Sequence, residues 1–165
     1  MPDDLAVIES LYPEAFPDED LLPLLGELLR ESSTTLSLVG KIGGLLVGHV
    51  IFTKCHVAES AGADALLGPL AIAPAWQRRG IGSTIVRAGL QRLEDAGVAQ
   101  VYVLGDPAYY GRLGFKTEMR VTPPYELPPE WVGAWQSQTL TGAAKPRSGK
   151  LLLPRPWLQP ALWTP

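Results

Sequence analysis

The feature that most constrains the fold of this chain is an apolar stretch followed by a short turn that contains Gly80 and Gly82. The apolar stretch, residues 66–74, has the length of a strand and ends at Pro74. After the turn, apolar residues recur at intervals of three and four, as in an amphipathic helix: Ile81, Ile85, Val86, Leu90 and Leu93. The sequence therefore predicts a strand, a glycine-containing turn and a helix, in this order.

This arrangement is suited to binding phosphate. The first turn of a helix has backbone N–H groups without intrahelical partners, and the peptide dipoles add partial positive charge there. Gly80 and Gly82 have no Cβ, so a pyrophosphate could approach the backbone closely, and Arg78 and Arg79 add charge. The simpler alternative is a tight turn with two solvated arginines. Neither the Rossmann fingerprint nor the Walker-type loop fits the glycine spacing.

Two motifs carry a resemblance to a known family. The sequence LAIAP at residues 70–74, followed by QRRGIG at residues 77–82, closely resembles the acetyl-CoA-binding signature of GNAT superfamily N-acetyltransferases. The sequence YYGRLGF at residues 109–115 stands where that family has its Tyr-x-x-x-Gly-Phe element. The two motifs occur in the right order and spacing, so the pair is more specific than either one alone.

The resemblance implies acetyl-CoA as cosubstrate and no metal. It implies that the main chain of Leu70, Ala71 and Ile72 pairs with the pantetheine arm, at a strand that diverges from its parallel neighbour. The other implied cofactor-binding residues are Gln77, Arg78, Arg79, Gly80, Ile81, Gly82, Ser83, Asp106 and Tyr109. Asp106 stands where many relatives have an asparagine.

Residue matching also implies that Tyr110 is the general acid. Direct transfer of an acetyl group to a primary amine needs a neutral amine, a donor for the oxyanion and a proton for the leaving thiolate. The alternative for Tyr110 is a purely structural ring. The sequence does not decide which group is the general base; the candidates are Glu118, Glu126, His56 and a water relay. A CoA-binding sensor without catalysis, a transferase for longer acyl-CoA and a non-amine acceptor are the alternative functions.

The fold implied by the resemblance is a mixed α/β (α+β) domain over residues 1–165. Its central sheet is mostly antiparallel with one splayed parallel pair, and helices lie on both faces. The chain begins too late to supply the strand that usually precedes the first helix of the family. The first two helices of the family line the entrance for the acyl acceptor.

The pattern along the chain predicts the remaining elements. A helix begins near Asp3 or Asp4, and its core face consists of Leu5, Ile8, Leu11 and Tyr12. A second helix covers residues 19–30, and two strands joined at Gly43-Gly44 cover residues 35–42 and 45–57, with His49 in the core. Further strands are expected at residues 100–104, 116–121, 131–140 and 150–153, with a short helix at 108–113. The tail, residues 154–165, packs either on the core or on a second copy in a homodimer.

Composition limits the partners. The net charge of −3 and the absence of a basic stripe argue against nucleic acid, and no apolar run is long enough for a membrane span. A single cysteine, Cys55, excludes an internal disulfide and indicates a reducing, cytoplasmic compartment. No His/Cys spacing suggests zinc. We therefore expect a small-molecule or peptide amine as the acceptor.

Overall fold

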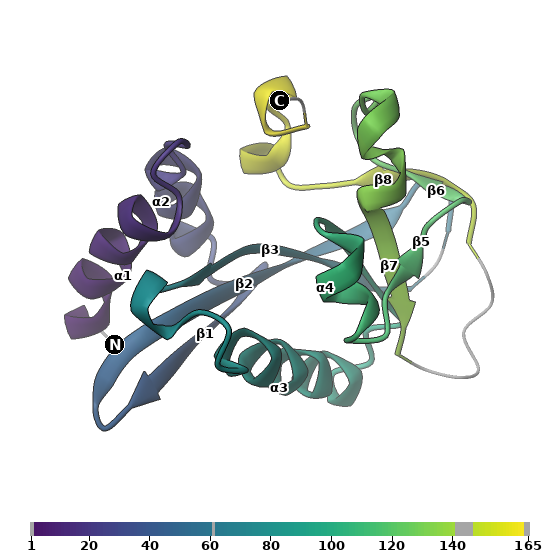
Figure 1. Ribbon diagram of the computed structural model, residues 1–165. Helices are drawn as coiled ribbons and strands as arrows, with labels where there is room; N and C mark the ends of the chain where they lie inside the picture. The colour runs from purple at the N-terminus through teal and green to yellow at the C-terminus, as the bar shows by residue number, and fades with distance from the viewer. Residues whose placement is uncertain (1, 61, 141–146, 164–165) are drawn as a thin grey trace. The chain divides into compact units, whose positions relative to one another are not determined.

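The computed structural model describes residues 2–60, 62–140 and 147–163 (Figure 1). The α-helices are α1 (Pro2–Ala15), α2 (Leu22–Arg30), α3 (Ile81–Asp95) and α4 (Pro107–Gly111). The strands are β1 (Thr35–Ile42), β2 (Leu45–Val57), β3 (Asp64–Ile72), β4 (Gln100–Leu104), β5 (Lys116–Thr117), β6 (Val121–Thr122), β7 (Trp135–Thr139) and β8 (Gly149–Leu152). Four 3-10 turns complete the list: η1 (Pro74–Trp76), η2 (Pro129–Ala134), η3 (Arg155–Trp157) and η4 (Pro160–Trp163).

The sheet is mixed, as predicted. Its hydrogen-bonded order is β5-β7-β4-β3-β2-β8-β6, and β1 pairs with β2. The pairs β3–β4 and β6–β8 are parallel, whereas β4–β7, β5–β7 and β2–β8 are antiparallel. The predicted bounds of β1, β2 and β4 are confirmed.

The chain forms two compact units. The first consists of Met1–Phe52 and Gly68–Gly89, and the second of Thr53–Leu67 and Leu90–Pro165. Strands β2 and β3 and helix α3 contribute residues to both units.

In the first unit, helices cover both faces of the sheet. Gly40 lets α3 approach one face closely, since a Cβ there would lie 3.2 Å from Ile85 and 3.3 Å from Ile81, and Gly48 lies on the same face, where a Cβ would lie 3.5 Å from Ile81. Successive residues of a strand point to opposite faces, so His49 faces the other side, where it contacts Tyr12 of α1. Figure 1 shows α1 and α2 on one side of β1 and β2, with the start of α3 on the other.

His49 is a hydrogen-bonded core histidine, as predicted. The Tyr12 hydroxyl lies 2.7 Å from Nδ1, and Ser37 Oγ lies 2.6 Å from Nε2. The described residues offer the buried Tyr12 hydroxyl no other partner, so we assign it as donor to Nδ1, and Nε2–H then donates to Ser37. Burial lowers the pKa of His49 from 6.5 to about 4, so the ring is neutral at pH 7.

The buried neutral His49 makes stability depend on pH. The unfolded chain binds this proton more readily, so stability is full above pH 6.5 and falls as the pH drops toward the folded-state pKa of about 4. We expect the wild type to lose about 2 kcal/mol between pH 7.5 and pH 5 from this residue. Urea unfolding of wild type and His49→Gln at both pH values measures it.

The control for this experiment is His56→Gln, because His56 is the other histidine of the chain and is exposed on the same strand. This variant should retain the wild-type dependence on pH, whereas His49→Gln should flatten it. Equal dependence in all three proteins would contradict the role of His49.

In the second unit, the C-terminal tail packs on the core. Trp157 and Trp163 are buried, the indole N–H of Trp157 donates to Thr53 Oγ1 at 3.1 Å, and that of Trp163 donates to the Trp157 carbonyl at 3.0 Å. Trp163 also makes an edge contact with Trp135, with ring centroids 5.9 Å apart. Residues 154–163 of the predicted tail therefore pack on the core, residues 164–165 lie outside the described part of the chain, and the homodimer stays a prediction.

A buried ion pair also holds the second unit together. Asp64 is fully buried, and its carboxylate pairs with the Arg147 guanidinium and accepts the Tyr102 hydroxyl at 3.0 Å. Burial, followed by the nearby Asp64 carboxylate, raises the pKa of the Cys55 thiol, so this cysteine stays protonated and a poor nucleophile.

Several predicted boundaries are wrong. The second helix begins at Leu22 rather than at residue 19, and Leu5 is exposed rather than in the core. The strand predicted at residues 116–121 is split into β5 and β6, because Glu118 Oε2 accepts the N–H groups of Arg120 and Val121 and turns the chain. The first part of the strand predicted at 131–140 is the 3-10 turn η2, and only Trp135–Thr139 is extended.

Candidate functional site

The turn before α3 presents a row of free backbone donors. Among the described residues, none accepts a hydrogen bond from the N–H groups of residues 78–83. Arg78 and Gly80 adopt positive φ values of 63° and 80°. Successive N–H groups in such conformations form a concave anion-binding surface, and the helix dipole adds to it. The strand, the turn and the helix follow one another as predicted, and phosphate binding at the turn stays a prediction.

Side chains around the turn hold it in place. The Gln77 amide donates to the Ile72 carbonyl at 3.0 Å, and the Thr84 hydroxyl donates to the Gly80 carbonyl at 2.8 Å. The Arg79 guanidinium lies over the Trp76 ring, 5.0 Å from its centroid. Gln77 therefore anchors the turn to the end of β3, a positioning role that the sequence alone did not indicate. Arg78 and Arg79 are exposed, so their charges can reach an anion.

The end of β3 extends beyond the part of the strand that pairs with β4, while β2 remains its neighbour on the other edge. The registered parallel pairs with β4 run from Asp64 to Leu67, and β3 continues to Ile72. Pro69 has no N–H to donate to a neighbouring strand. Leu70, Ala71 and Ile72, the residues predicted to pair with pantetheine, all lie in this continuation.

Tyr110 lies in the second unit, on the short helix α4. Its ring is buried between the rings of Tyr109 and Phe115, at centroid distances of 4.9 and 5.7 Å, both edge-to-face. None of the described residues accepts a hydrogen bond from the Tyr110 hydroxyl, which leaves this proton available to a ligand. Burial raises the pKa of Tyr110 above its usual value of 10.0, so the phenol stays protonated at neutral pH.

The backbone that carries Tyr110 is fixed by neighbours that sequence reasoning missed. A Cβ at Gly105 would lie 2.5 Å from the Tyr110 ring, so only glycine fits there. The Gln136 amide donates to the Gly105 carbonyl at 3.0 Å, and the Gly105 N–H donates to Ala134 at 3.0 Å. Asp106, predicted as a cofactor contact, caps α4 through its carboxylate, which accepts the Ala108 N–H at 2.9 Å.

Glu118 is not free to act as a general base. Oε1 accepts from the Gln100 amide at 3.0 Å and the Ser137 hydroxyl at 2.6 Å, while Oε2 accepts two backbone N–H groups. A carboxylate that holds four donors is structural. Glu126 and His56 are both exposed, and no metal-binding group of three His, Cys, Asp or Glu exists among the described residues.

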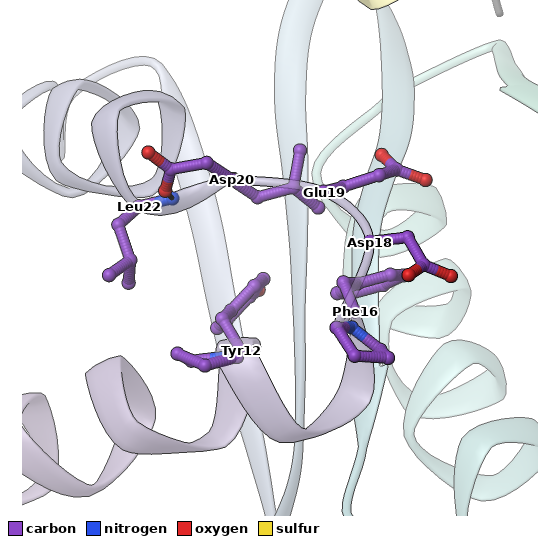
Figure 2. A pocket seen from close by; sticks show the side chains of 9 residues that line it. Tyr12, Phe16, Asp18, Glu19, Asp20 and Leu22 are labelled. Atoms are coloured by element: carbon purple, nitrogen blue, oxygen red, sulfur yellow. Dashed lines mark hydrogen bonds between the residues drawn. The ribbon is translucent and has the colours of Figure 1, made fainter.

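A small pocket lies at the connection between α1 and α2. It has a volume of about 270 Å³ and is lined by Tyr12, Phe16 and an acidic stretch, Asp18, Glu19 and Asp20. Figure 2 shows the three carboxylates spread along the connection, with the two rings beneath it. The Asp20 carboxylate accepts the Leu22 N–H at 3.3 Å, at the start of α2.

The comparisons with known proteins identify the family. The Acetyltransferase (GNAT) family matches residues 5–115. This chain belongs to the GNAT acetyltransferase family. The GNAT relatives include the N-acetyltransferase YjhQ of Escherichia coli, which is 30% identical over 90% of this chain and 86% of its own length.

Solved GNAT structures confirm the fold. The GNAT family N-acetyltransferase YhbS from Escherichia coli, solved in complex with CoA, has a TM-score of 0.84 and 27% identity, over 96% of this chain and 89% of that one. A GNAT family acetyltransferase from Brucella melitensis, solved with acetyl-CoA, has a TM-score of 0.74 and 28% identity, over 94% and 93% of the two chains. None of the helices in the described part of the chain combines the length and apolar character needed to cross a bilayer.

Proposed function

We propose that this GNAT protein transfers an acetyl group from acetyl-CoA to a primary amine by direct attack. The single observation that carries the proposal is the row of free N–H groups at residues 78–83, flanked by Arg78 and Arg79. These donors and the two arginines complement the negative charge of the CoA diphosphate. The CoA and acetyl-CoA complexes of the two GNAT structures support the same cosubstrate.

The chemistry follows from what acyl transfer requires. The neutral amine attacks the thioester carbonyl and a C–N bond forms as the C–S bond breaks. The attacking nitrogen gives up one proton, and the thiolate of CoA takes up one. Tyr110, whose protonated hydroxyl has no acceptor among the residues that the structure describes, is the proposed donor of that proton. A backbone N–H at the end of β3, within Leu70, Ala71 and Ile72, is the proposed donor to the oxyanion. No enzyme-bound acyl intermediate is needed.

The pocket at the α1–α2 connection supports a cationic acceptor. Three consecutive carboxylates, Asp18, Glu19 and Asp20, attract an ammonium group and repel an anion. A primary amine with a pKa of about 10.4 arrives mostly as the cation and must lose a proton before attack. A water relay or an exposed residue, Glu126 or His56, is the proposed route for that proton.

Thiol release tests the proposal. The purified protein is mixed with acetyl-CoA and a panel of primary amines, and free CoA is followed with a thiol reagent, with mass spectrometry of the acetylated amine. We expect amine-dependent release of CoA with acetyl-CoA. Tight binding of CoA without any turnover would indicate a sensor, and turnover only with longer thioesters would indicate a different acyl donor.

A further inference from the structure

The second unit contains a pocket to which the proposed chemistry assigns no ligand, although Glu126, one of the proposed proton routes, lies in its lining. It has a volume of about 550 Å³, and its lining includes Met119, Val121, Tyr125, Leu127, Val132 and Trp135. A pocket of this size accommodates a small organic ligand. We name it the Trp135 pocket.

The floor of the Trp135 pocket is a fixed aromatic surface. Trp135 is 3% exposed and stacks on Tyr102, with centroids 5.7 Å apart and an interplanar angle of 10°. Its indole N–H donates to the Val121 carbonyl at 2.8 Å. Because this only polar group is already satisfied, Trp135 offers a ligand apolar contact alone.

The rim of the pocket exposes apolar side chains to solvent. Met119 is 80% exposed and Val132 is 50% exposed. Single exposed apolar residues are common on protein surfaces, but here two of them border one cavity with a tryptophan floor. The free energy gained by covering them favours an apolar ligand.

The charged groups at the pocket do not favour an ion. The Glu118 carboxylate is fully occupied by four donors, as described above. The remaining charges in the lining, Glu126 and Lys150, are exposed and of opposite sign. The ligand class is therefore an uncharged apolar group, such as a phenyl ring or a branched alkyl chain.

The pocket adjoins the backbone that carries Tyr110. Trp135 pairs with Leu104 in the β4–β7 register, and the next residue, Gly105, donates to Ala134 and contacts the Tyr110 ring. We propose that the Trp135 pocket binds the apolar group of the acceptor, so that the preferred acceptor is an arylalkyl or alkyl amine. This inference rests on the proposed acetyl transfer.

Binding can be tested without any turnover. The chain has two methionines, Met1 and Met119, so ¹³C-methyl methionine labelling gives two signals, and Met119→Leu assigns the one from the pocket. We expect 2-phenylethylamine to shift the Met119 signal saturably and ethanolamine to leave it unmoved. Val132→Asp should raise the dissociation constant of 2-phenylethylamine at least about tenfold. A tenfold change corresponds to only part of the binding free energy that burial of a phenyl ring contributes.

The matched control is Leu158→Asp, because Leu158 is 46% exposed in the same unit and does not line the pocket. It should bind 2-phenylethylamine as the wild type does. The kcat/KM for acetylation should be at least about tenfold higher for 2-phenylethylamine than for ethanolamine, and Val132→Asp should reduce this ratio.

The outcomes distinguish a failure of ligand binding in the Trp135 pocket from a failure of the proposed acetyl transfer. Acetylation of both amines with equal kcat/KM and no Met119 shift would overturn the inference and leave the proposed function standing. A saturable Met119 shift without any acetyl transfer would support the pocket as a site for apolar amines and overturn the transfer to them. If Val132→Asp and Leu158→Asp raised the dissociation constant of 2-phenylethylamine equally, the assignment of the binding site to this pocket would also be overturned.

Discussion

Tyr110→Phe is expected to lower kcat for acetyl transfer by about 100-fold or more, with the dissociation constant of CoA nearly unchanged. The substitution removes only the hydroxyl. The ring contacts with Tyr109 and Phe115, which position the side chain, are retained by phenylalanine. Because the Tyr110 hydroxyl has no partner among the described residues, its removal leaves no protein group unsatisfied.

Steady-state kinetics and calorimetric titration of CoA measure this prediction. The loss should appear in kcat rather than in KM for acetyl-CoA, because the proton is needed only as the C–S bond breaks. The raised pKa of Tyr110 adds a second expectation: kcat should not decline between pH 8 and 10 through loss of this proton. A variant with wild-type kcat would remove Tyr110 from the mechanism.

Arg147→Met is expected to destabilise the protein by about 3–5 kcal/mol. It leaves the fully buried Asp64 carboxylate without its counter-charge, and among the described residues the Tyr102 hydroxyl is then its one remaining side-chain donor. Urea unfolding followed by tryptophan fluorescence measures the change.

Two further variants test the cause of this destabilisation. The double variant Asp64→Asn with Arg147→Met should recover more than half of the lost stability, because no buried charge remains. Arg155→Met is the control, since Arg155 is exposed in the same unit, and it should change stability by less than about 0.5 kcal/mol. If Arg147→Met behaved like this control, the ion pair would not stabilise the fold.

The parts of the fold with local causes could be predicted from the sequence. The bounds of β1 and β2 follow from two runs rich in apolar and β-branched residues, joined by the turn at Gly43-Gly44, both of which have positive φ. The turn at residues 78–83 could also be predicted, because it depends only on residues that are close together in the sequence. Consecutive amides and two glycines form its row of donors.

Features formed by residues far apart in the chain could not be predicted in this way. The break between β5 and β6 depends on Glu118, which appears in the sequence as a free acid but also binds Gln100 and Ser137. Gln136 supports Tyr110 from a different strand through Gly105. The Trp135 pocket combines residues from the β5–β6 connection, β6, residues 123–127, η2, β7 and β8, and no short motif marks it.

The most direct test of the account compares CoA with pantetheine, which lacks the diphosphate, in a titration of ¹⁵N-labelled protein. We expect CoA to shift the backbone amide signals of residues 78–83 saturably, because their N–H groups bind the diphosphate, and pantetheine to leave these signals in place. If CoA bound while these signals stayed in place, the diphosphate would bind elsewhere, and the proposed acetyl-CoA site would be contradicted.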